Sequence, residues 1–151
     1  MIRLHRGLTK DIYLPIAASV AAVEGTLMAF SSGTLIIATA TTAPSTIIGV
    51  LRKTIKTTDS DYASAKFVPV QVPVEHYVEW EMDVVTGTLV VGDVGLYCDI
   101  TTASASTIPS TCGVNRDGST YDVVQISRFV STTKDIVFLN TGIYGCGVIG
   151  A

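Results

Sequence analysis

β-Branched side chains dominate this sequence and restrict its fold more than any other feature. Threonine, valine and isoleucine occur 20, 19 and 14 times, so 53 of the 151 residues are β-branched. Such side chains are stiff at χ1 and pack better on a pleated sheet than on a helix. We therefore expect an all-β fold, either a small β-barrel or a sandwich, and we exclude a coiled coil and a helical bundle.

Charged residues are scarce and unevenly distributed. They make up 15% of the chain, against about 25% in average domains. Within residues 12–51 only Glu24 is charged. Within residues 84–115 only Asp93 and Asp99 are charged. Charges are depleted at the cores of protein interfaces, so these stretches favour an oligomer or a component of a larger assembly. A threonine-rich monomer that stays soluble through its hydroxyl groups is the alternative.

The overall charge and the apolar runs argue against two classes of partner. A formal net charge of −3 does not fit a nucleic-acid binder, which carries a basic patch or stripe. The longest apolar stretch, Ile16–Val23, is far shorter than the ~20 residues of a transmembrane helix. We expect neither a nucleic-acid nor a membrane partner.

The N-terminal segment imitates a signal peptide, because basic residues precede a short apolar run. Asp11 and Pro15 interrupt that run, which favours another interpretation. We predict an extended N-terminal arm over residues 1–22 and a single β domain over residues 23–151. At most one short helix is expected, over Ile16–Glu24, where Pro15 precedes an alanine-rich stretch.

Residues 25–50 and 87–114 look like two copies of one unit whose starts are 62 residues apart. Both begin with Gly-Thr-Leu, contain a second glycine (Gly33 and Gly95) and end in Gly-Val. We predict that each unit is a β-hairpin followed by a loop and another strand. The hairpin turns are expected at residues 31–33 and at Gly92-Asp93, because glycine supplies the positive φ of tight turns.

Two further strands are expected between these units. Pro69 and Pro73 remove two backbone donors from the same side of their strand as Gln71, which predicts an edge strand or a segment outside the ladder. Residues 74–84 then alternate between apolar and acidic side chains, as in a half-buried strand. Its acidic positions either meet a basic partner or, as we prefer, form a solvated face. Beyond the second unit, residues 121–130 and 135–140 are also expected to be strands.

The residue types that carry chemistry do not form a catalytic or metal-binding motif. His76 falls on the apolar side of its strand, where a core histidine is more common than a catalytic base, and His5 is distant in sequence. Asp59 and Asp61 lack the other ligand positions of a calcium loop. Trp80 is either a core residue, which we prefer, or a platform for a sugar. We predict no catalytic residue, no metal site and no cofactor.

The cysteine content is equally uninformative about chemistry. Cys98, Cys112 and Cys146 are an odd number and show no C-x-x-C spacing. The preferred interpretation is three reduced, buried thiols. A disulfide between Cys98 and Cys112 is the alternative.

The first unit resembles the strand–turn–strand of tailed-phage head decoration proteins, also called capsid cement proteins. Gly25, Gly33, Gly49 and Val50 match that pattern, and the second unit repeats it at Gly87, Gly95, Gly113 and Val114. The resemblance implies a β-rich structural protein, often a homotrimer, that binds the outer surface of a phage capsid. Its partner there is the major capsid protein, and the N-terminal arm adds to a neighbouring sheet.

We accordingly predict a structural virion protein that stabilises contacts between capsid subunits and is assembled in the host cytoplasm, and no enzyme. The alternative is a carbohydrate-binding or adhesin-type β module of a virion fibre, a baseplate or a secreted protein.

Overall fold

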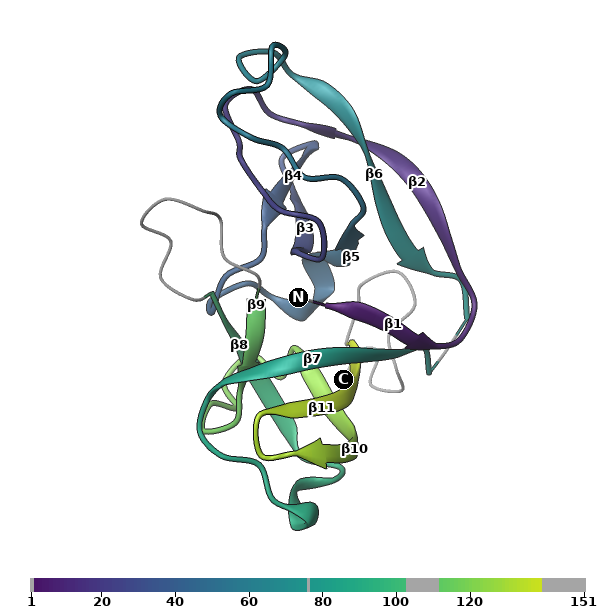
Figure 1. The fold of residues 1–151 in the computed structure, drawn as a ribbon, viewed down its shortest axis with the longest axis vertical. Coiled ribbons are helices and arrows are strands. Elements are labelled where there is room, and N and C mark those ends of the chain that lie inside the picture. Colours follow the sequence, from purple (N-terminus) through teal and green to yellow (C-terminus); the bar gives the residue numbers. More distant parts are fainter. Residues whose placement is uncertain (1, 76, 103–111, 140–151) are drawn as a thin grey trace.

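The computed structural model describes residues 2–75, 77–102 and 112–139, and these residues form an all-β structure (Figure 1). Their helical elements are two short 3-10 turns, η1 (Pro44–Thr46) and η2 (Val91–Asp93). The strands are β1 (Arg3–Arg6), β2 (Thr9–Ile16), β3 (Leu27–Ser31), β4 (Thr34–Ile37), β5 (Ile47–Leu51), β6 (Lys66–Pro73), β7 (Glu79–Thr86), β8 (Tyr97–Thr102), β9 (Cys112–Asn115), β10 (Val124–Ser131) and β11 (Lys134–Leu139). The all-β prediction is confirmed.

Strands β2 to β6 close into the first barrel, which occupies the upper half of Figure 1. The order around this barrel is β2-β4-β3-β5-β6, and β6 returns to pair with β2. Neighbouring strands are antiparallel except β2 and β4, which run parallel where Ile16 faces Leu35. The predicted first hairpin is confirmed as β3–β4, in which Ser31 pairs with Thr34 across the turn.

Strands β7 to β11 close into the second barrel, in the lower half of Figure 1. The order is β7-β9-β8-β10-β11, and β11 returns to β7. Only β7 and β9 are parallel, where Val84 faces Val114. β1 is an additional strand that pairs with β7, with Arg3 opposite Glu81. The N-terminal strand therefore adds to the second barrel before the chain enters the first.

The two barrels have the same topology. When β2, β3, β4, β5 and β6 are replaced in turn by β7, β8, β9, β10 and β11, every pairing of the first barrel becomes a pairing of the second. The single parallel pair is preserved as well, because β2–β4 becomes β7–β9. The fold is thus a tandem repeat of one five-stranded unit, which agrees with the prediction of two related units.

Matching turns before β3 and β8 give the residue correspondence. The turns Val23–Thr26 and Asp93–Leu96 are each closed by a hydrogen bond from the fourth N–H to the first carbonyl, at 3.1 and 2.9 Å. Gly25 and Gly95 are the third residues, with φ of 87° and 92°. A type II turn requires a positive φ at that place, which glycine adopts without strain.

The same two glycines bind the next strand in the same way. Gly25 N–H donates to the Leu51 carbonyl at 2.8 Å, and Gly95 N–H donates to the Ile126 carbonyl at 2.8 Å. In return, the Leu51 amide donates to Thr26 at 2.9 Å and the Ile126 amide to Leu96 at 3.0 Å. Residues in the connections before β3 and β8 therefore correspond at a spacing of 70 positions.

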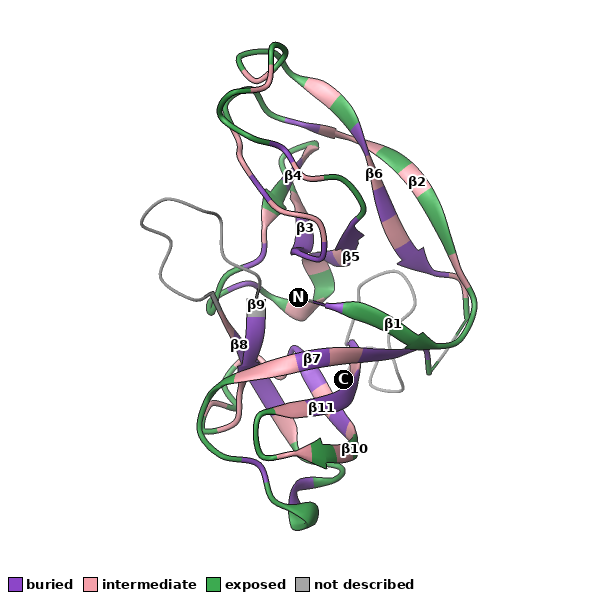
Figure 2. Ribbon diagram, viewed as in Figure 1, coloured by how far each residue is buried: buried purple, intermediate pink, exposed green. Residues whose placement is uncertain are grey.

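One apolar cluster joins the barrels. The first barrel encloses its own cluster: Ile16, Ala22, Met28, Leu35, Leu51, Ile55, Val68, Val70 and Val72. The cluster inside the second barrel continues onto the outer faces of β3 and β5, so that Met28 points into the first barrel whereas Leu27 and Ala29 pack with the second. Figure 2 shows the resulting burial of β3 and β5. The two barrels are therefore packed against each other through a common core.

The predicted repeat was in the wrong register. Gly25 precedes β3, but Gly87 precedes the loop that contains η2, and the hairpin expected around Gly92-Asp93 is a 3-10 turn instead. The counterpart of Gly25 is Gly95, 70 residues later. The Gly-Thr-Leu match between residues 25 and 87 is therefore not an equivalence of position.

The two Gly-Val landmarks have separate packing causes. A Cβ on Gly49 in β5 would lie 2.2 Å from the Gln71 carbonyl oxygen of β6. A Cβ on Gly113 in β9 would lie 2.0 Å from the Val85 side chain of β7. Since β9 is the counterpart of β4 rather than β5, these glycines are needed at different contacts. The two Gly-Val pairs therefore agree in sequence but occupy different positions in the repeat.

The strand pairing does not place a boundary between an arm and a domain at residue 22. Residues 3–16 are extended, as predicted for an arm, but β2 pairs along its whole length with β6 of the same chain. The repeated units span residues 9–73 and 79–139, rather than an arm at 1–22 and one domain at 23–151. The expected helix over Ile16–Glu24 is absent, because Ala22 forms a β-bridge with Ile55.

The prolines of β6 limit one side of the strand without making it an edge. β6 pairs with β2 at all eight positions but with β5 only at Val70 and Gln71. The Pro69 carbonyl accepts from the Arg52 amide at 3.0 Å, so the proline side faces β5. Missing N–H groups shorten that ladder. The prediction of an edge strand is wrong because the complete ladder to β2 closes the barrel.

Candidate docking surfaces

The sequence candidates for chemistry have structural roles or lie outside the described residues. Trp80 is completely buried in the common core, as preferred from the sequence. The Asp59 carboxylate accepts the Lys56 amide, and Asp61 binds Lys66. His5 is exposed in β1, and His76 lies outside the described residues. The described side chains of this set are not brought together.

The acidic positions of residues 79–83 meet basic groups within the chain, whereas Glu75 accepts the Leu8 amide. Glu79 is buried; Arg128 lies 3.4 Å from its carboxylate and Arg6 of β1 lies 4.0 Å from it. Lys134 of β11 lies 3.0 Å from Glu81 and 3.8 Å from the Asp83 carboxylate. The preferred interpretation as a solvated face is therefore wrong for Glu79, since β1 and β10 supply its basic neighbours.

Cys98 is buried and free of disulfides, and burial raises the pKa of its thiol to about 12, with a contribution from the nearby Asp135. A thiolate is the reactive form of cysteine, so this group is inert near neutral pH. Cys112 begins β9, and Cys146 lies outside the described residues. Within the part of the chain that the structure describes, no group of three metal-ligating side chains is found. No helix there is long and apolar enough to cross a membrane.

Apolar side chains are instead exposed on the connection between β7 and β8. Val90, Val91, Val94 and Leu96 are 53%, 70%, 50% and 38% exposed and surround η2. We call these four residues the η2 surface. It lies at the lower end of the second barrel in Figure 1, and Figure 2 colours the ribbon at η2 as exposed. This is the largest group of neighbouring exposed aliphatic residues along the described sequence.

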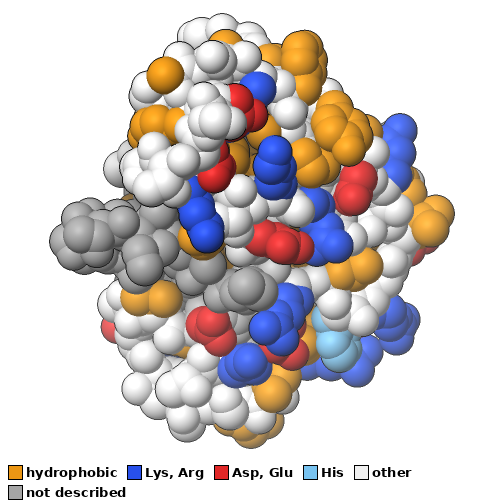
Figure 3. All heavy atoms as spheres, turned by 45° about the horizontal axis from the view of Figure 1, so that its top comes forward, with side chains coloured by type: hydrophobic (Ala, Val, Ile, Leu, Met, Phe, Trp, Pro, Cys, Tyr) orange, Lys and Arg blue, Asp and Glu red, His pale blue; other side chains and the backbone are white. Residues whose placement is uncertain are grey.

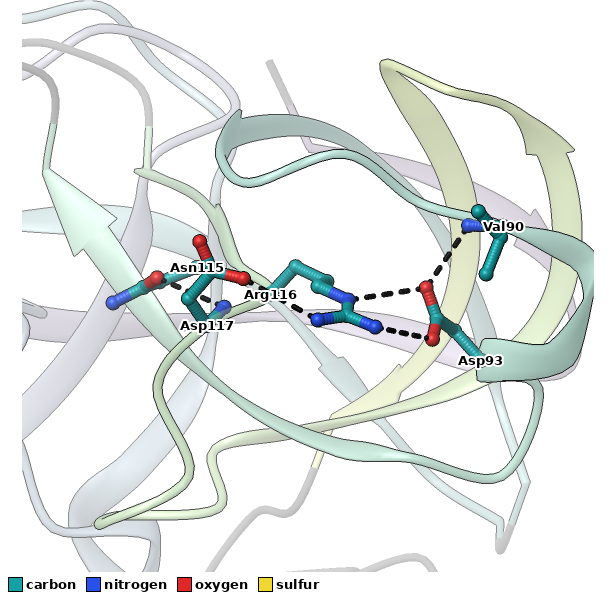
Figure 4. Close-up of polar contacts among 5 residues, drawn as sticks. All are labelled: Val90, Asp93, Asn115, Arg116 and Asp117. Atoms are coloured by element: carbon teal, nitrogen blue, oxygen red, sulfur yellow. Dashed lines mark hydrogen bonds and ion pairs between the residues drawn. The ribbon is translucent and has the colours of Figure 1, made fainter.

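An ion pair holds the η2 surface in place (Figure 4). Arg116, which follows β9, donates from Nη2 and Nε to the two oxygens of Asp93 at 2.9 and 3.2 Å. The Val90 amide donates to the same carboxylate at 2.9 Å. Hydrogen bonding from Arg116, followed by that from Val90, lowers the pKa of Asp93 below its usual 3.8. The connection is thus fixed by a charged, largely buried group, so its valines are presented rigidly.

A second apolar surface lies on the first barrel. Tyr13 and Phe67 are 67% and 69% exposed on the outer side of β2 and β6. Tyr13 pairs with Pro69 and Pro15 pairs with Phe67, so all four side chains share one face. We call it the aromatic face. Figure 3 shows hydrophobic side chains over the upper part of the molecule and mixed charges over its centre.

A shallow hollow of about 380 Å³ lies between β1 and the first barrel, and it offers no catalytic arrangement. It is lined by Ile2, Arg3, Leu4, Glu24, Gly25, Arg52 and Gln71. Arg52 and Glu24 form an ion pair of 3.0 Å at its margin. Glu24 and Arg52 thus bind each other, and Gln71 donates to the Thr9 hydroxyl at 2.8 Å.

Comparisons with known proteins give no match. No family model, no curated protein and no solved structure is similar to this chain. The η2 surface was missed from the sequence, although its signal was present in the run of valines around Gly92-Asp93. An apolar run between glycines was interpreted as a hairpin strand, and the role of Arg116 depends on a contact across 23 positions.

Proposed function

We propose that this chain is a structural virion protein that binds the outer surface of a phage capsid and stabilises contacts between major capsid protein subunits. The observation that carries the proposal is the η2 surface, four exposed aliphatic side chains on a connection that Arg116 and Asp93 fix. Exposed apolar patches on soluble proteins mark interaction sites. A rigid patch loses little conformational entropy when it binds.

The rest of the molecule suits a mechanical role. The two barrels share one apolar core, and β1 adds to the second barrel. Such a body resists separation of its parts. Many identical copies on a shell bind with avidity, so each contact needs only modest affinity. No catalytic step belongs to this function, and a homotrimer assembled in the host cytoplasm remains part of the proposal.

The test is the stability of shells with and without the protein. Phage capsids that lack the protein are expected to lose integrity on heating or at low ionic strength, and added protein is expected to restore it. Sedimentation of the free protein measures whether it is a trimer. Equal stability of bare and decorated capsids would contradict the proposal.

A carbohydrate-binding module is a second candidate, favoured by the aromatic face rather than by Trp80. Trp80 is fully buried and has no access to a sugar, whereas Tyr13 and Phe67 are exposed on one side of a sheet. Aromatic rings at such positions stack on apolar faces of ligands. Glycan-array binding that disappears in Phe67→Ala, while binding to shells persists, would favour this candidate.

A further inference from the structure

In the first barrel, the connection between β2 and β3 is covered by the chain itself. Ala22 pairs with Ile55 through two backbone hydrogen bonds, from Ala22 N–H at 3.1 Å and from Ile55 N–H at 2.7 Å. Both residues are at most 2% exposed. Ile55 belongs to the long connection between β5 and β6, which therefore lies across the connection between β2 and β3.

The repeat identifies the corresponding place in the second barrel. Ser19 N–H donates to the Tyr62 carbonyl at 2.8 Å, and Leu89 N–H donates to the Thr132 carbonyl at 3.3 Å. Both partners are shifted by the same 70 positions as Gly25 and Gly95. Residue 92 is therefore the counterpart of Ala22, and Gly92 occupies it.

Among the described residues, no corresponding segment covers this place in the second barrel. Residues 52–61 lie between Leu51 and Tyr62, but only residues 127–131 lie between their counterparts Ile126 and Thr132. Those residues continue β10 and pair with β11 instead of crossing over η2. A Cβ built on Gly92 meets no atom within 4 Å. The site that is closed at Ala22 is thus open at Gly92, and the η2 surface around it is exposed.

We propose that the η2 surface binds an extended, uncharged, aliphatic segment of a partner protein. This segment lies across Gly92 as the 52–61 connection lies across Ala22, with an aliphatic side chain in the place of Ile55. The inference names the partner's chemistry at the surface on which the proposed function rests. Bound peptide segments commonly recognise such sites through backbone pairing and side-chain pockets.

The charge distribution favours a protein segment over a lipid surface. Between residues 84 and 98 the only charged residue is Asp93, and Arg116 neutralises it. Loops and helices that bind membranes combine apolar residues with lysine or arginine that attract anionic headgroups. The η2 surface lacks that ring of basic side chains along its own segment. An uncharged protein segment is the matching occupant.

The direct test selects ligands without assuming a capsid. A displayed library of random linear peptides is panned against the wild-type protein, and the selected peptides are titrated against Val91→Asp and Phe67→Asp. The two substituted side chains are equally exposed, at 70% and 69%, but only Val91 belongs to the η2 surface. Circular dichroism establishes that both variants fold.

The expected result is enrichment of uncharged aliphatic peptides that bind Phe67→Asp normally and lose at least about tenfold in affinity for Val91→Asp. Binding should also slow amide hydrogen exchange at residues 89–96. No enrichment, or binding that Val91→Asp leaves unchanged, would overturn the inference. Cosedimentation of the wild type with phosphatidylcholine–phosphatidylserine vesicles that Val91→Asp abolishes would overturn it in favour of a lipid surface.

A second arm separates this inference from the proposed function. Wild type, Val91→Asp and Phe67→Asp are each mixed with shells that lack the protein, and cosedimentation is measured. If wild type fails to bind shells while the selected peptides still require Val91, the proposed function fails and the inference stands. If Val91→Asp binds shells like wild type and the selected peptides do not require Val91, the inference fails and the proposed function stands.

Discussion

The two barrels share one topology but differ in how each is completed. In the first barrel, the 52–61 connection covers Ala22 and buries Ile55. In the second barrel, a shorter path leaves Gly92 open and four aliphatic side chains exposed. The backbone hydrogen bonds that flank both places correspond, although Ala22 lies in a β-bridge and Gly92 in the 3-10 turn η2. The η2 surface is therefore exposed because the described part of the second barrel has no covering segment, and not because its fold differs.

The interiors differ as well. The inward positions of β6 are Val68, Val70 and Val72, whereas those of β11 are Asp135, Val137 and Leu139. Asp135 is fully buried, and neither of its carboxylate oxygens accepts a hydrogen bond from another residue within the described part of the chain. Burial raises its pKa from 3.8 to about 7, and the nearby Asp83 adds to the rise. The second barrel thus carries a polar group where the first carries valine.

The largest effect is expected from breaking the common core. Trp80→Ala should lower the free energy of unfolding by about 3–5 kcal/mol, because it leaves a large cavity. Since the same cluster includes the outer residues of β3 and β5, both barrels should unfold together. Urea denaturation followed by circular dichroism measures this, with Phe67→Ala as the exposed control. Two separate transitions would show that the barrels are independent.

Asp135→Val places in β11 the side chain that Val68 supplies in β6, and it should raise the free energy of unfolding. Above pH ~7 the folded protein holds an unpaired buried carboxylate, which costs about 4 kcal/mol relative to the unfolded chain. Below the unfolded pKa of 3.8 both states are protonated. The gain should therefore be small near that pH, grow as pH rises and level off above about 7.

Denaturation of wild type and Asp135→Val across this pH range measures the difference. Asp11→Val, at an exposed position of β2, is the control. A gain that is independent of pH would show that the carboxylate of Asp135 is not the cause.

Substitutions at two glycines test whether Gly92 lies in open space. Gly49→Ala should destabilise by about 1–3 kcal/mol, since its Cβ would meet the Gln71 backbone and force a shift. Gly92→Ala gives the second barrel the residue of the first in open space and should change stability by less than about 1 kcal/mol. Thermal melting compares the two. An equal loss in both variants would contradict the open site at Gly92.

The smallest effect on stability is expected when the ion pair that holds the η2 surface is removed. Arg116→Ala should cost less stability than any of the variants above, because the guanidinium is partly solvated. The stabilisation from Asp93, whose pKa is lowered, is present above pH ~4 and lost as pH falls. Removing Arg116 should therefore weaken this acid dependence. Amide exchange should accelerate at Val90, with Arg52→Ala as the control; unchanged exchange at Val90 would show that the ion pair does not fix the surface.

Part of the fold could be predicted from the local preferences of the residues. The threonine, valine and isoleucine content predicted an all-β chain, and Gly33 located the β3–β4 turn. The sequence also indicated a repeat, but shared Gly-Thr-Leu and Gly-Val letters suggested a spacing of 62 rather than 70. The Gly-Val pairs at Gly49 and Gly113 agree in sequence, but the two glycines are needed at different packing contacts. Backbone hydrogen bonds identify equivalent positions even where the side chains differ, as at Ser19 and Leu89.

The docking surface could not be predicted in the same way. A run of valines is compatible with a buried strand, and its exposure depends on whether another segment crosses it. The sequence alone determined the β character, the scarcity of charge and the glycines of the turns, because these follow from side-chain stiffness, solvation and φ. Only the tertiary structure decided that β2 closes a barrel, that Arg116 meets Asp93 and that Gly92 stays uncovered. Those outcomes depend on contacts between distant residues, which local preferences do not specify.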